Sequence, residues 1–348
     1  MSSMEIWTTF FPKKVAWEIT SAMANGEGGS SDWLKHEAII NEALQTLKKA
    51  GIKGVRLIII PTELTTDGKQ YDWSPVEKAL SLCHKHKLAV DFCLGPFQYA
   101  HYPGIRLPQM LQRDVNEGLA FLDTNPKLRE YGLRFLELQL KRYSRDARIR
   151  GFYLGNEWPD RNIVERTTIK IGVSRGFMAE SASIAKDATV KPILFNTNID
   201  PASQRRLFEV FQPFHEILGK QMRLGFDPYP SRERWDVTPL VKMKRFVKSY
   251  SACVENVCSV FDKSQLFFAE VEAQPWGHGE SWYRLIKESK NPNEKIYNFH
   301  KDDLKKTFAK YISPTGIQEV SLWSPEFWLV AQFMGIAWPL EEVKKLSS

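Results

Sequence analysis

Residues 50–60 read AGIKGVRLIII, a stretch that holds both the end of one predicted helix and the start of a predicted strand. Gly51 stands where a helix ends in a left-handed residue before the chain turns back. The β-branched run over residues 54–60 then predicts a buried strand. The same order of elements recurs along the chain, and this alternation predicts repeated βα units around a parallel sheet.

Eight short runs rich in β-branched or aromatic residues predict the strands. They cover residues 5–10, 54–60, 89–95, 151–156, 192–198, 224–229, 266–271 and 318–323. Amphipathic stretches between them predict helices, the clearest over residues 32–50, 74–87, 126–145, 175–186, 203–218 and 239–260. Two of these stretches begin with a capping side chain followed by proline, Ser74-Pro75 and Asn125-Pro126, an order typical of helix starts.

The predicted fold class is α/β, a (β/α)8 TIM barrel forming a single domain over residues 1–348 with extended βα loops. Eight strands with eight crossovers favour a closed barrel over an open doubly wound sheet, because no glycine-rich phosphate loop follows the first strand. No linker rich in Gly, Ser or Pro divides the chain. The cluster GEGGSS, residues 26–31, lies between the first predicted strand and its predicted helix, and it predicts a mobile loop at the barrel mouth.

Composition excludes several classes of protein. Hydrophobic residues make up 43% and charged residues 26%, the usual globular mixture. The net charge of +7 is scattered over helical faces such as residues 242–248 and 301–306, so no nucleic-acid partner is expected. Residues 1–11 lack an export signal and no apolar run is long enough to span a bilayer, so we expect a cytoplasmic protein without a membrane partner, unless a signal was trimmed.

Two glutamates stand at the ends of apolar strands, where the active sites of such barrels lie. Glu157 ends the fourth run in GFYLGNEWP, and Glu270 ends the seventh in LFFAEVEAQPW. A carboxylate in such a place is costly unless it is paired or used. Glycoside hydrolysis needs two carboxyl groups on opposite sides of one bond, and strands four and seven lie across a barrel from one another. The pair therefore predicts a glycosidase.

The chain resembles glycoside hydrolase clan A, and within it the family-five-like barrels, along most of its length. Asn156-Glu157 looks like the acid/base segment of that clan, and Glu270 looks like its nucleophile. The motif GVRL, residues 54–57, resembles the second strand of the clan, whose arginine, here Arg56, braces the nucleophile. The resemblance implies net retention by double displacement through a covalent glycosyl-enzyme at Glu270, with no metal or organic cofactor.

Further positions match the clan, and two depart from it. Tyr229 matches the sixth-strand aromatic whose hydroxyl contacts the nucleophile, and Trp323 matches the eighth-strand tryptophan that forms a sugar platform. Strand three ends in LGPFQYAH, which contains the candidate substrate contact Gln98, where a family-five enzyme often has an earlier histidine. Ala269 replaces the threonine or small polar residue that commonly precedes the nucleophile. These departures bear on the substrate more than on the mechanism.

Chemistry alone divides the roles in the same way. Asn156, Tyr153 and Trp158 surround Glu157 in sequence and favour the protonated carboxyl of a general acid. Asn156 is also expected to hold the sugar hydroxyl beside the anomeric centre. Arg56 and a hydrogen bond from Tyr229 favour the ionised form of Glu270.

Other candidates lie near the same strand ends. Glu272 is expected to point to the same side as Glu270, where it binds sugar hydroxyls or replaces Glu270 as nucleophile. Asp227 and Asn198 either touch substrate or cap helices. The four cysteines lack zinc-ligand spacing, so buried free thiols are expected, and the histidines favour surface or sugar contacts over metal ligation. Aromatic residues of the last two loops are expected to be sugar platforms: Trp276, His278, Trp282, Tyr283, Phe327 and Trp328.

The sequence thus predicts a retaining β-glycosidase of the cellulase, β-mannanase or β-glucosidase type, acting on a gluco- or manno-configured oligo- or polysaccharide or another β-glycoside. Two alternatives stay open. One is a catalytically silent barrel that binds carbohydrate, and the other is a transglycosylase relative that shares the carboxylate pair. The intact set Glu157, Glu270 and Arg56 argues against the silent barrel.

Overall fold

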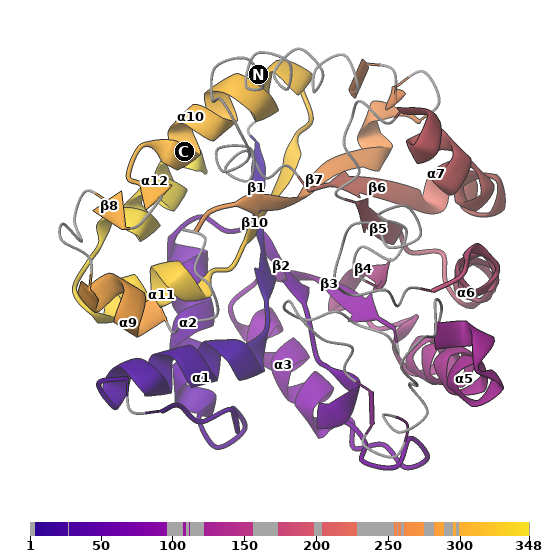
Figure 1. Cartoon of the computed structure of the whole chain (residues 1–348), viewed down its shortest axis with the longest axis horizontal. Helices are drawn as coiled ribbons and strands as arrows, with labels where there is room; N and C mark the ends of the chain where they lie inside the picture. The colour runs from indigo at the N-terminus through magenta and orange to yellow at the C-terminus, as the bar shows by residue number, and fades with distance from the viewer. Residues whose placement is uncertain are drawn as a thin grey trace.

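A computed structural model describes the chain at residues 4–26, 28–95, 107–108, 111, 122–155, 173–197, 204–227, 254–255, 257–258, 261–274, 282–288, 295–296 and 299–347. Eight parallel strands form a closed barrel in the order β1-β10-β7-β6-β5-β4-β3-β2 (Figure 1). They are β1 (Glu5–Phe10), β2 (Gly54–Leu57), β3 (Ala89–Leu94), β4 (Ile149–Leu154), β5 (Ile193–Thr197), β6 (Met222–Phe226), β7 (Leu266–Glu272) and β10 (Glu319–Trp323). The predicted (β/α)8 barrel is confirmed.

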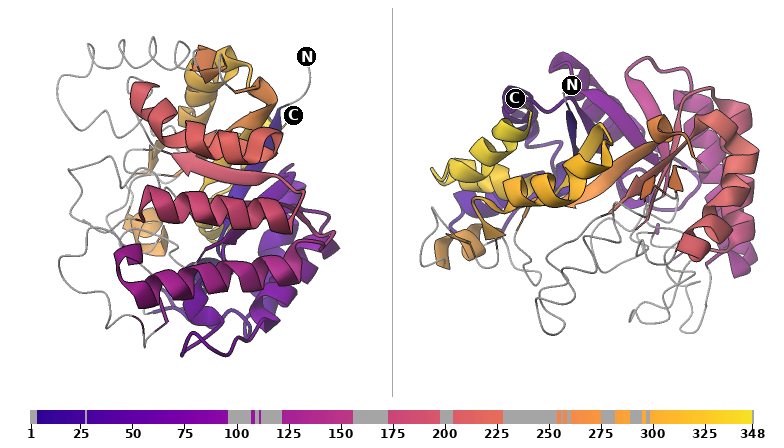
Figure 2. Two further views of the ribbon diagram at one scale, coloured as in Figure 1. Left: turned by 90° about the vertical axis from the view of Figure 1, so that its right-hand side faces the viewer. Right: turned by 90° about the horizontal axis from the view of Figure 1, so that it is seen from above.

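Helices surround this barrel, and α5, α6 and α7 lie side by side along one flank (Figure 2). The described α-helices are α1 (Pro12–Met23), α2 (Glu37–Lys49), α3 (Ser74–Lys85), α5 (Pro126–Tyr143), α6 (Arg175–Ala188), α7 (Gln204–Leu218), α9 (Trp282–Glu288), α10 (Asp303–Thr307), α11 (Glu326–Phe333) and α12 (Trp338–Leu346). A short antiparallel pair, β8 (Lys295–Ile296) and β9 (Phe299–His300), lies outside the barrel sheet. Within these described ranges, no helix is long and apolar enough to cross a membrane.

The first helix of the chain, α1, was not among the predicted helices. α1 begins directly after β1, with Pro12 in its first turn, and it places residues 26–31 between α1 and α2. The glycine-rich cluster thus lies between the first strand and the predicted helix, which is α2, but the unpredicted α1 separates the cluster from the strand. Its end is tied to α1, because the Ser30 amide donates to the Thr20 hydroxyl at 2.7 Å. The predicted helix over residues 239–260 lies almost wholly outside the described residues.

Alternation along the strands separates two packing layers. Val55, Leu57, Phe92 and Leu94 belong to the large core between strands and helices. A second buried cluster fills the barrel interior: Phe11, Ile58, Ile60, Cys93, Tyr153, Leu194, Phe267 and Ala269. Gly54 is required by this filling, since a Cβ there would lie 2.3 Å from the Trp7 ring. The interior is thus a packed core whose upper layer supports the strand ends.

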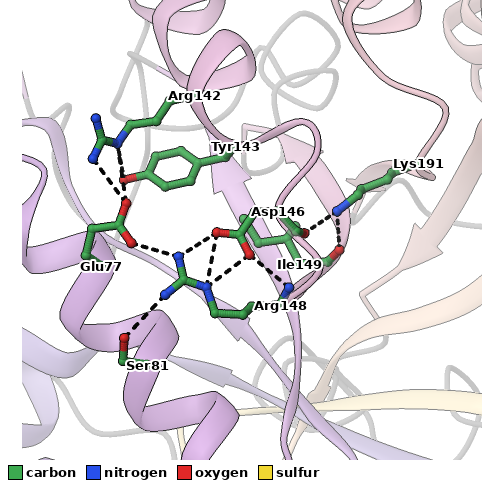
Figure 3. Close-up of polar contacts among 8 residues, drawn as sticks. All are labelled: Glu77, Ser81, Arg142, Tyr143, Asp146, Arg148, Ile149 and Lys191. Atoms are coloured by element: carbon green, nitrogen blue, oxygen red, sulfur yellow. Dashed lines mark hydrogen bonds and ion pairs between the residues drawn. The ribbon is translucent and has the colours of Figure 1, made fainter.

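The outer helices are also joined by charged side chains at the surface. Glu77 of α3 accepts hydrogen bonds from Arg142 of α5 at 3.2 Å and from Arg148 at 2.7 Å (Figure 3). Arg148 also donates to Asp146, and both residues lie in the turn that leads into β4. We call Glu77, Arg142, Asp146 and Arg148 the surface network. It connects two outer helices to the start of a barrel strand.

Candidate active site

Glu270 lies near the carboxyl end of β7 and is 2% exposed. A register shift marks a β-bulge beside it, because Val320 and Leu322 of β10 pair with Phe268 and Val271 of β7. An advance of two residues along β10 is thus matched by an advance of three residues along β7. Bulges of this kind change the direction of a side chain and are frequent next to active sites.

The bulge explains which way Glu270 points. Phe267 and Ala269 belong to the interior cluster, whereas Phe268 and Val271 pack in the core beneath the helices. Strict alternation from Ala269 would turn Glu270 outward. With the extra residue, Ala269 and Glu270 both face the interior, and Glu270 reaches Arg56 on a strand that is not a neighbour of β7.

Arg56 of β2 pairs with Glu270 across the barrel. Its Nη1 donates to Glu270 Oε1 at 2.8 Å, and the two side chains are 1% and 2% exposed. Burial by itself lowers the pKa of Arg56. The facing Cys93, Tyr153 and Glu270 raise this pKa by more than burial lowers it, so the guanidinium remains charged. Its carbon lies 4.2 Å from the centre of the Tyr153 ring. The predicted contact between Arg56 and Glu270 is present, while their catalytic roles stay predictions.

Asn196 of β5 is a member of the site that the sequence prediction missed. Its Nδ2 donates to Glu270 Oε1 at 3.3 Å and to Asp227 Oδ2 at 2.9 Å. Asp227 follows β6 directly, is 5% exposed, and its amide donates to the Thr197 carbonyl. A signal existed in the sequence, since Asn196 is a polar residue two positions after Leu194 on the inward side of an otherwise apolar strand.

The remaining predicted residues divide into two groups. Glu272 is the last residue of β7, is 6% exposed, and is in register with the half-buried Trp323 at the end of β10. These two lie at the same strand ends as Glu270, as predicted. The other predicted site residues lie outside the described residues: Gln98, Asn156, Glu157, Tyr229 and Trp276.

Four aromatic residues predicted as loop platforms are core residues instead. Trp282 and Tyr283 begin α9, and Phe327 and Trp328 lie in α11; all four are at most 8% exposed. The Trp282 and Phe327 rings meet at 5.6 Å, and Trp328 donates its ring N–H to the Ala273 carbonyl at 2.6 Å. Because two helices pack together here, their rings are buried between them. The prediction of sugar platforms at these positions is wrong.

A buried polar cluster lies beside the end of β10. Ser324, which follows Trp323, has a left-handed backbone with φ of 61°, and its hydroxyl donates to Glu326 at 2.7 Å. Lys14 of α1 lies 3.8 Å from the same Glu326 carboxylate. Glu18 of α1 accepts the Trp282 backbone N–H at 3.0 Å, and burial raises the pKa of Glu18 to about 7. This cluster connects α1, α9 and α11 next to Trp323, the residue predicted to form a sugar platform.

The buried thiols predicted from the sequence are present at Cys83 and Cys93, whereas Cys258 is partly exposed. Burial raises the pKa of the Cys93 thiol, which therefore stays protonated beside Arg56. No group of three or more His, Cys, Asp or Glu side chains able to hold a metal ion occurs among the described residues. The polar groups at the described strand ends are thus one guanidinium, one amide and three carboxyl groups, from Arg56, Asn196, Asp227, Glu270 and Glu272.

Solved structures of glycoside hydrolases share the closed eight-stranded barrel fold. No protein-family model and no curated protein matches the sequence. Solved structures do match in fold. The predicted resemblance to glycoside hydrolase clan A is confirmed at the level of architecture.

Three solved structures illustrate the similarity. A GH5_18 protein from Streptomyces cattleya in complex with GlcNAc matches with a TM-score of 0.65 and 11% identity, over 99% of this chain and 80% of that one. A GH5_18 variant from Bifidobacterium longum subsp. longum in complex with Manβ1-4GlcNAc gives 0.66 and 11% over 99% and 78%. The exo-β-1,4-mannosidase Op5Man5 from Opitutaceae bacterium strain TAV5 gives 0.55 and 15% over 92% and 51%.

Proposed function

We propose that the protein is a retaining β-glycoside hydrolase in which Glu270 is the nucleophile and Glu157 the general acid/base. The observation that carries this proposal is the buried Glu270 carboxylate, which a bulge turns toward the barrel axis and Arg56 holds at 2.8 Å. A carboxylate placed so deeply at a strand end serves chemistry in this kind of barrel.

The reaction follows from two carboxyl groups on opposite sides of the glycosidic bond. Glu270 attacks the anomeric carbon while Glu157 gives its proton to the leaving oxygen, so the glycosidic bond breaks as the bond to Glu270 forms. Water then gives a proton to Glu157 and its oxygen to the anomeric carbon, which releases Glu270. Two inversions at one carbon give net retention.

The ion pair with Arg56 favours the ionised form of Glu270, which attack requires. Arg56 and Asn196 both donate to Oε1 of the carboxylate. Two donors on one oxygen orient the carboxylate, and we assign the attack on the sugar to the other oxygen, Oε2. Glu157 follows Leu154, the last residue of β4, by three positions.

We propose a β-linked, gluco- or manno-configured glycan as substrate. Support comes from structures of similar fold, since one GH5_18 variant binds Manβ1-4GlcNAc and another match is an exo-β-1,4-mannosidase. The half-buried Trp323, in register with Glu272, offers a flat apolar ring beside a carboxylate that can accept from sugar hydroxyls.

Labelling and rescue test the two roles separately. A 2-deoxy-2-fluoro aryl β-glycoside is expected to inactivate the enzyme slowly, and peptide mass spectrometry to find the sugar on Glu270. E157A is expected to retain turnover of substrates with good leaving groups and to respond to azide with a β-glycosyl azide product. NMR of the first product should show the β-anomer. Full activity of both E157A and E270A on natural glycans would contradict the proposal.

A further inference from the structure

Asn196 occupies the centre of the polar contacts around Glu270. It comes from β5, whereas Glu270, Arg56 and Asp227 come from β7, β2 and the end of β6. Asn196 is 1% exposed, and it meets Glu270 past the intervening strand β6, so the contact runs through the barrel interior. A polar side chain buried in this way is costly unless its hydrogen bonds are made.

The chemistry of its neighbours fixes the orientation of the Asn196 amide. The two hydrogens of Nδ2 match two carboxylate oxygens, Glu270 Oε1 at 3.3 Å and Asp227 Oδ2 at 2.9 Å. Its Oδ1 faces the guanidinium of Arg56, with Nη2 at 3.5 Å. The flipped amide would set an oxygen against two carboxylates and an NH2 against a cation. Only the present orientation satisfies all three partners.

We propose that Asn196 is the positioning residue of the nucleophile and that Asp227 anchors its amide. This inference rests on the proposed function of Glu270. Arg56 supplies a charge to Glu270 Oε1 from one side, and Asn196 supplies a second, uncharged donor to the same oxygen. With both donors in place the carboxylate has one rotation, and the attacking oxygen is aimed before substrate arrives.

The groups that face Glu270 set the expected pH response. Among the described residues, the ionisable side chains around it are Arg56 of β2, Cys93 of β3, Tyr153 of β4, Asp227 after β6 and Glu272 of β7. Burial raises the pKa of both Cys93 and Tyr153, so neither carries charge at neutral pH. Loss of a donor to Glu270 favours its protonated form, whereas loss of a neighbouring negative charge favours its ionised form.

Substitution of Asn196 tests the donor. N196A is expected to lower kcat/KM on an aryl β-glycoside by about 10- to 100-fold, the worth of one hydrogen bond to a charged group. The loss should fall on kcat and on the rate of labelling by the fluoro-sugar, with KM little changed. The acidic limb of the pH profile should move to higher pH, because that limb reports the nucleophile in the free enzyme.

Substitution of Asp227 tests the sign of the charge effect. D227N keeps an acceptor for the Asn196 amide but removes a negative charge beside Glu270. The acidic limb is therefore expected to move to lower pH, opposite to its shift in N196A. A residue that only packs the interior would shift neither limb. If N196A does not fold, N196S takes its place, because a serine hydroxyl donates to only one of the two carboxylates.

A double exchange separates positioning from structure. N196D with D227N keeps one carboxylate and one amide at the two positions, and the hydrogen bond between them can re-form. The exchange nevertheless removes the amide donor from β5 and sets a carboxylate against Glu270. Activity is therefore expected to stay at or below that of N196A while thermal stability recovers. Recovery of activity to the wild-type value would overturn the inference.

The control is N125A, which removes the side chain that caps α5 by accepting from the Lys127 and Leu128 amides. It is expected to lose stability while kcat/KM and the pH profile stay at wild-type values. Labelling distinguishes the two possible failures. If the fluoro-sugar labels Glu270 in the wild type but N196A keeps wild-type kcat/KM and pH profile, only the inference fails. If Glu270 is never labelled and E270A is fully active, the proposed function fails.

Discussion

Two charge networks lie in the same barrel, one near each end; the first is partly buried and the second is fully buried. Near the amino ends, Arg150 of β4 donates to Glu319 of β10 at 2.6 Å and also to Asp91 of β3. Arg223 of β6 donates to Glu319 at 3.1 Å. We call these four residues the lower quartet. At the carboxyl ends, Arg56, Asn196, Asp227 and Glu270 form the second network, the upper cluster.

The two networks differ in how charge is balanced. In the lower quartet two arginines face two carboxylates, and each guanidinium also lies over an aromatic ring, Trp7 at 3.7 Å or Phe267 at 5.0 Å. Burial opposes ionisation of Glu319, but hydrogen bonds and charges from both arginines lower its pKa overall. In the upper cluster one arginine contacts one carboxylate, Glu270, and the Asn196 amide joins Glu270 to a second carboxylate, Asp227.

This difference indicates different roles. Matched charges with multiple hydrogen bonds hold strands together and leave no carboxylate available for reaction. A carboxylate held on one oxygen by a charge and an amide is oriented yet still able to react. We therefore expect changes in the lower quartet to alter stability, and changes in the upper cluster to alter turnover.

The largest expected effect comes from exchanging one carboxylate in each network for its amide. E270Q is expected to lower kcat by about 10⁴- to 10⁶-fold, because the covalent step is lost. E319Q is expected to keep kcat within about threefold of wild type in the folded protein, since Glu319 lies near the amino ends of the strands. Steady-state kinetics on one aryl β-glycoside measures both. Equal losses in the two variants would remove the functional distinction between the networks.

A stability measurement tests whether the lower quartet stabilises the barrel. R150M leaves Asp91 buried without its bidentate partner and removes one of the two arginines on Glu319. Breaking a buried pair by removal of one partner costs about 3 to 5 kcal/mol of unfolding free energy. Urea unfolding followed by tryptophan fluorescence measures the loss. A loss below about 1 kcal/mol would show that the lower quartet does not stabilise the barrel.

Glu18 is a buried carboxyl group that belongs to neither network, and the cation beside it among the described residues is Lys14. Its pKa is about 7 in the folded protein and about 4.3 in an unfolded chain. Because the folded value is the higher one, its contribution to stability is full below about pH 4 and is lost as pH rises through 7. The total change is about 4 kcal/mol.

The E18Q variant removes this titration and keeps an acceptor for the Trp282 amide. We expect E18Q to gain stability relative to wild type as pH is raised from 5 to 8, measured by urea unfolding at both values. E42Q, on the exposed side of α2, serves as the control and should follow wild type. If the difference between E18Q and wild type is the same at both pH values, burial of Glu18 does not control this dependence.

The sequence predicted the barrel well because its signals are local. Glycine stops, proline starts and β-branched runs located all eight strands, and they placed Glu270 and Arg56 on strands that meet across the interior. The start of α1 carried a signal that was overlooked, since Pro12 follows the last strand residue by only two positions.

Other features of the site depend on tertiary structure. The bulge that turns Glu270 inward is defined only by the register of β7 against β10. The contacts of Asn196 depend on strands that are distant in sequence. Trp282 and Phe327 read as loop residues, but the packing of α9 against α11 buries them. Local sequence patterns predict the position of a residue along a strand. The contacts of its side chain depend on the neighbouring strands, which the local pattern does not contain.

The smallest expected effect tests whether burial, and not ion pairing itself, gives the lower quartet its role. The surface network also joins one carboxylate to two arginines, since Glu77 accepts from Arg142 and Arg148 (Figure 3). Its glutamate is more exposed than the carboxylates of the lower quartet, with Glu77 at 37% against Asp91 at 3% and Glu319 at 12%. Water and salt screen such pairs, so E77A should cost only about 0.2 to 1 kcal/mol of unfolding free energy. Raising NaCl to about 1 M should shrink that loss, because the screening length falls to about 3 Å, while the loss in R150M stays unchanged. A salt-sensitive loss in R150M would mean that salt screens the pair of Arg150 with the buried Asp91 as well, and the contrast of the lower quartet with the upper cluster would then need another cause.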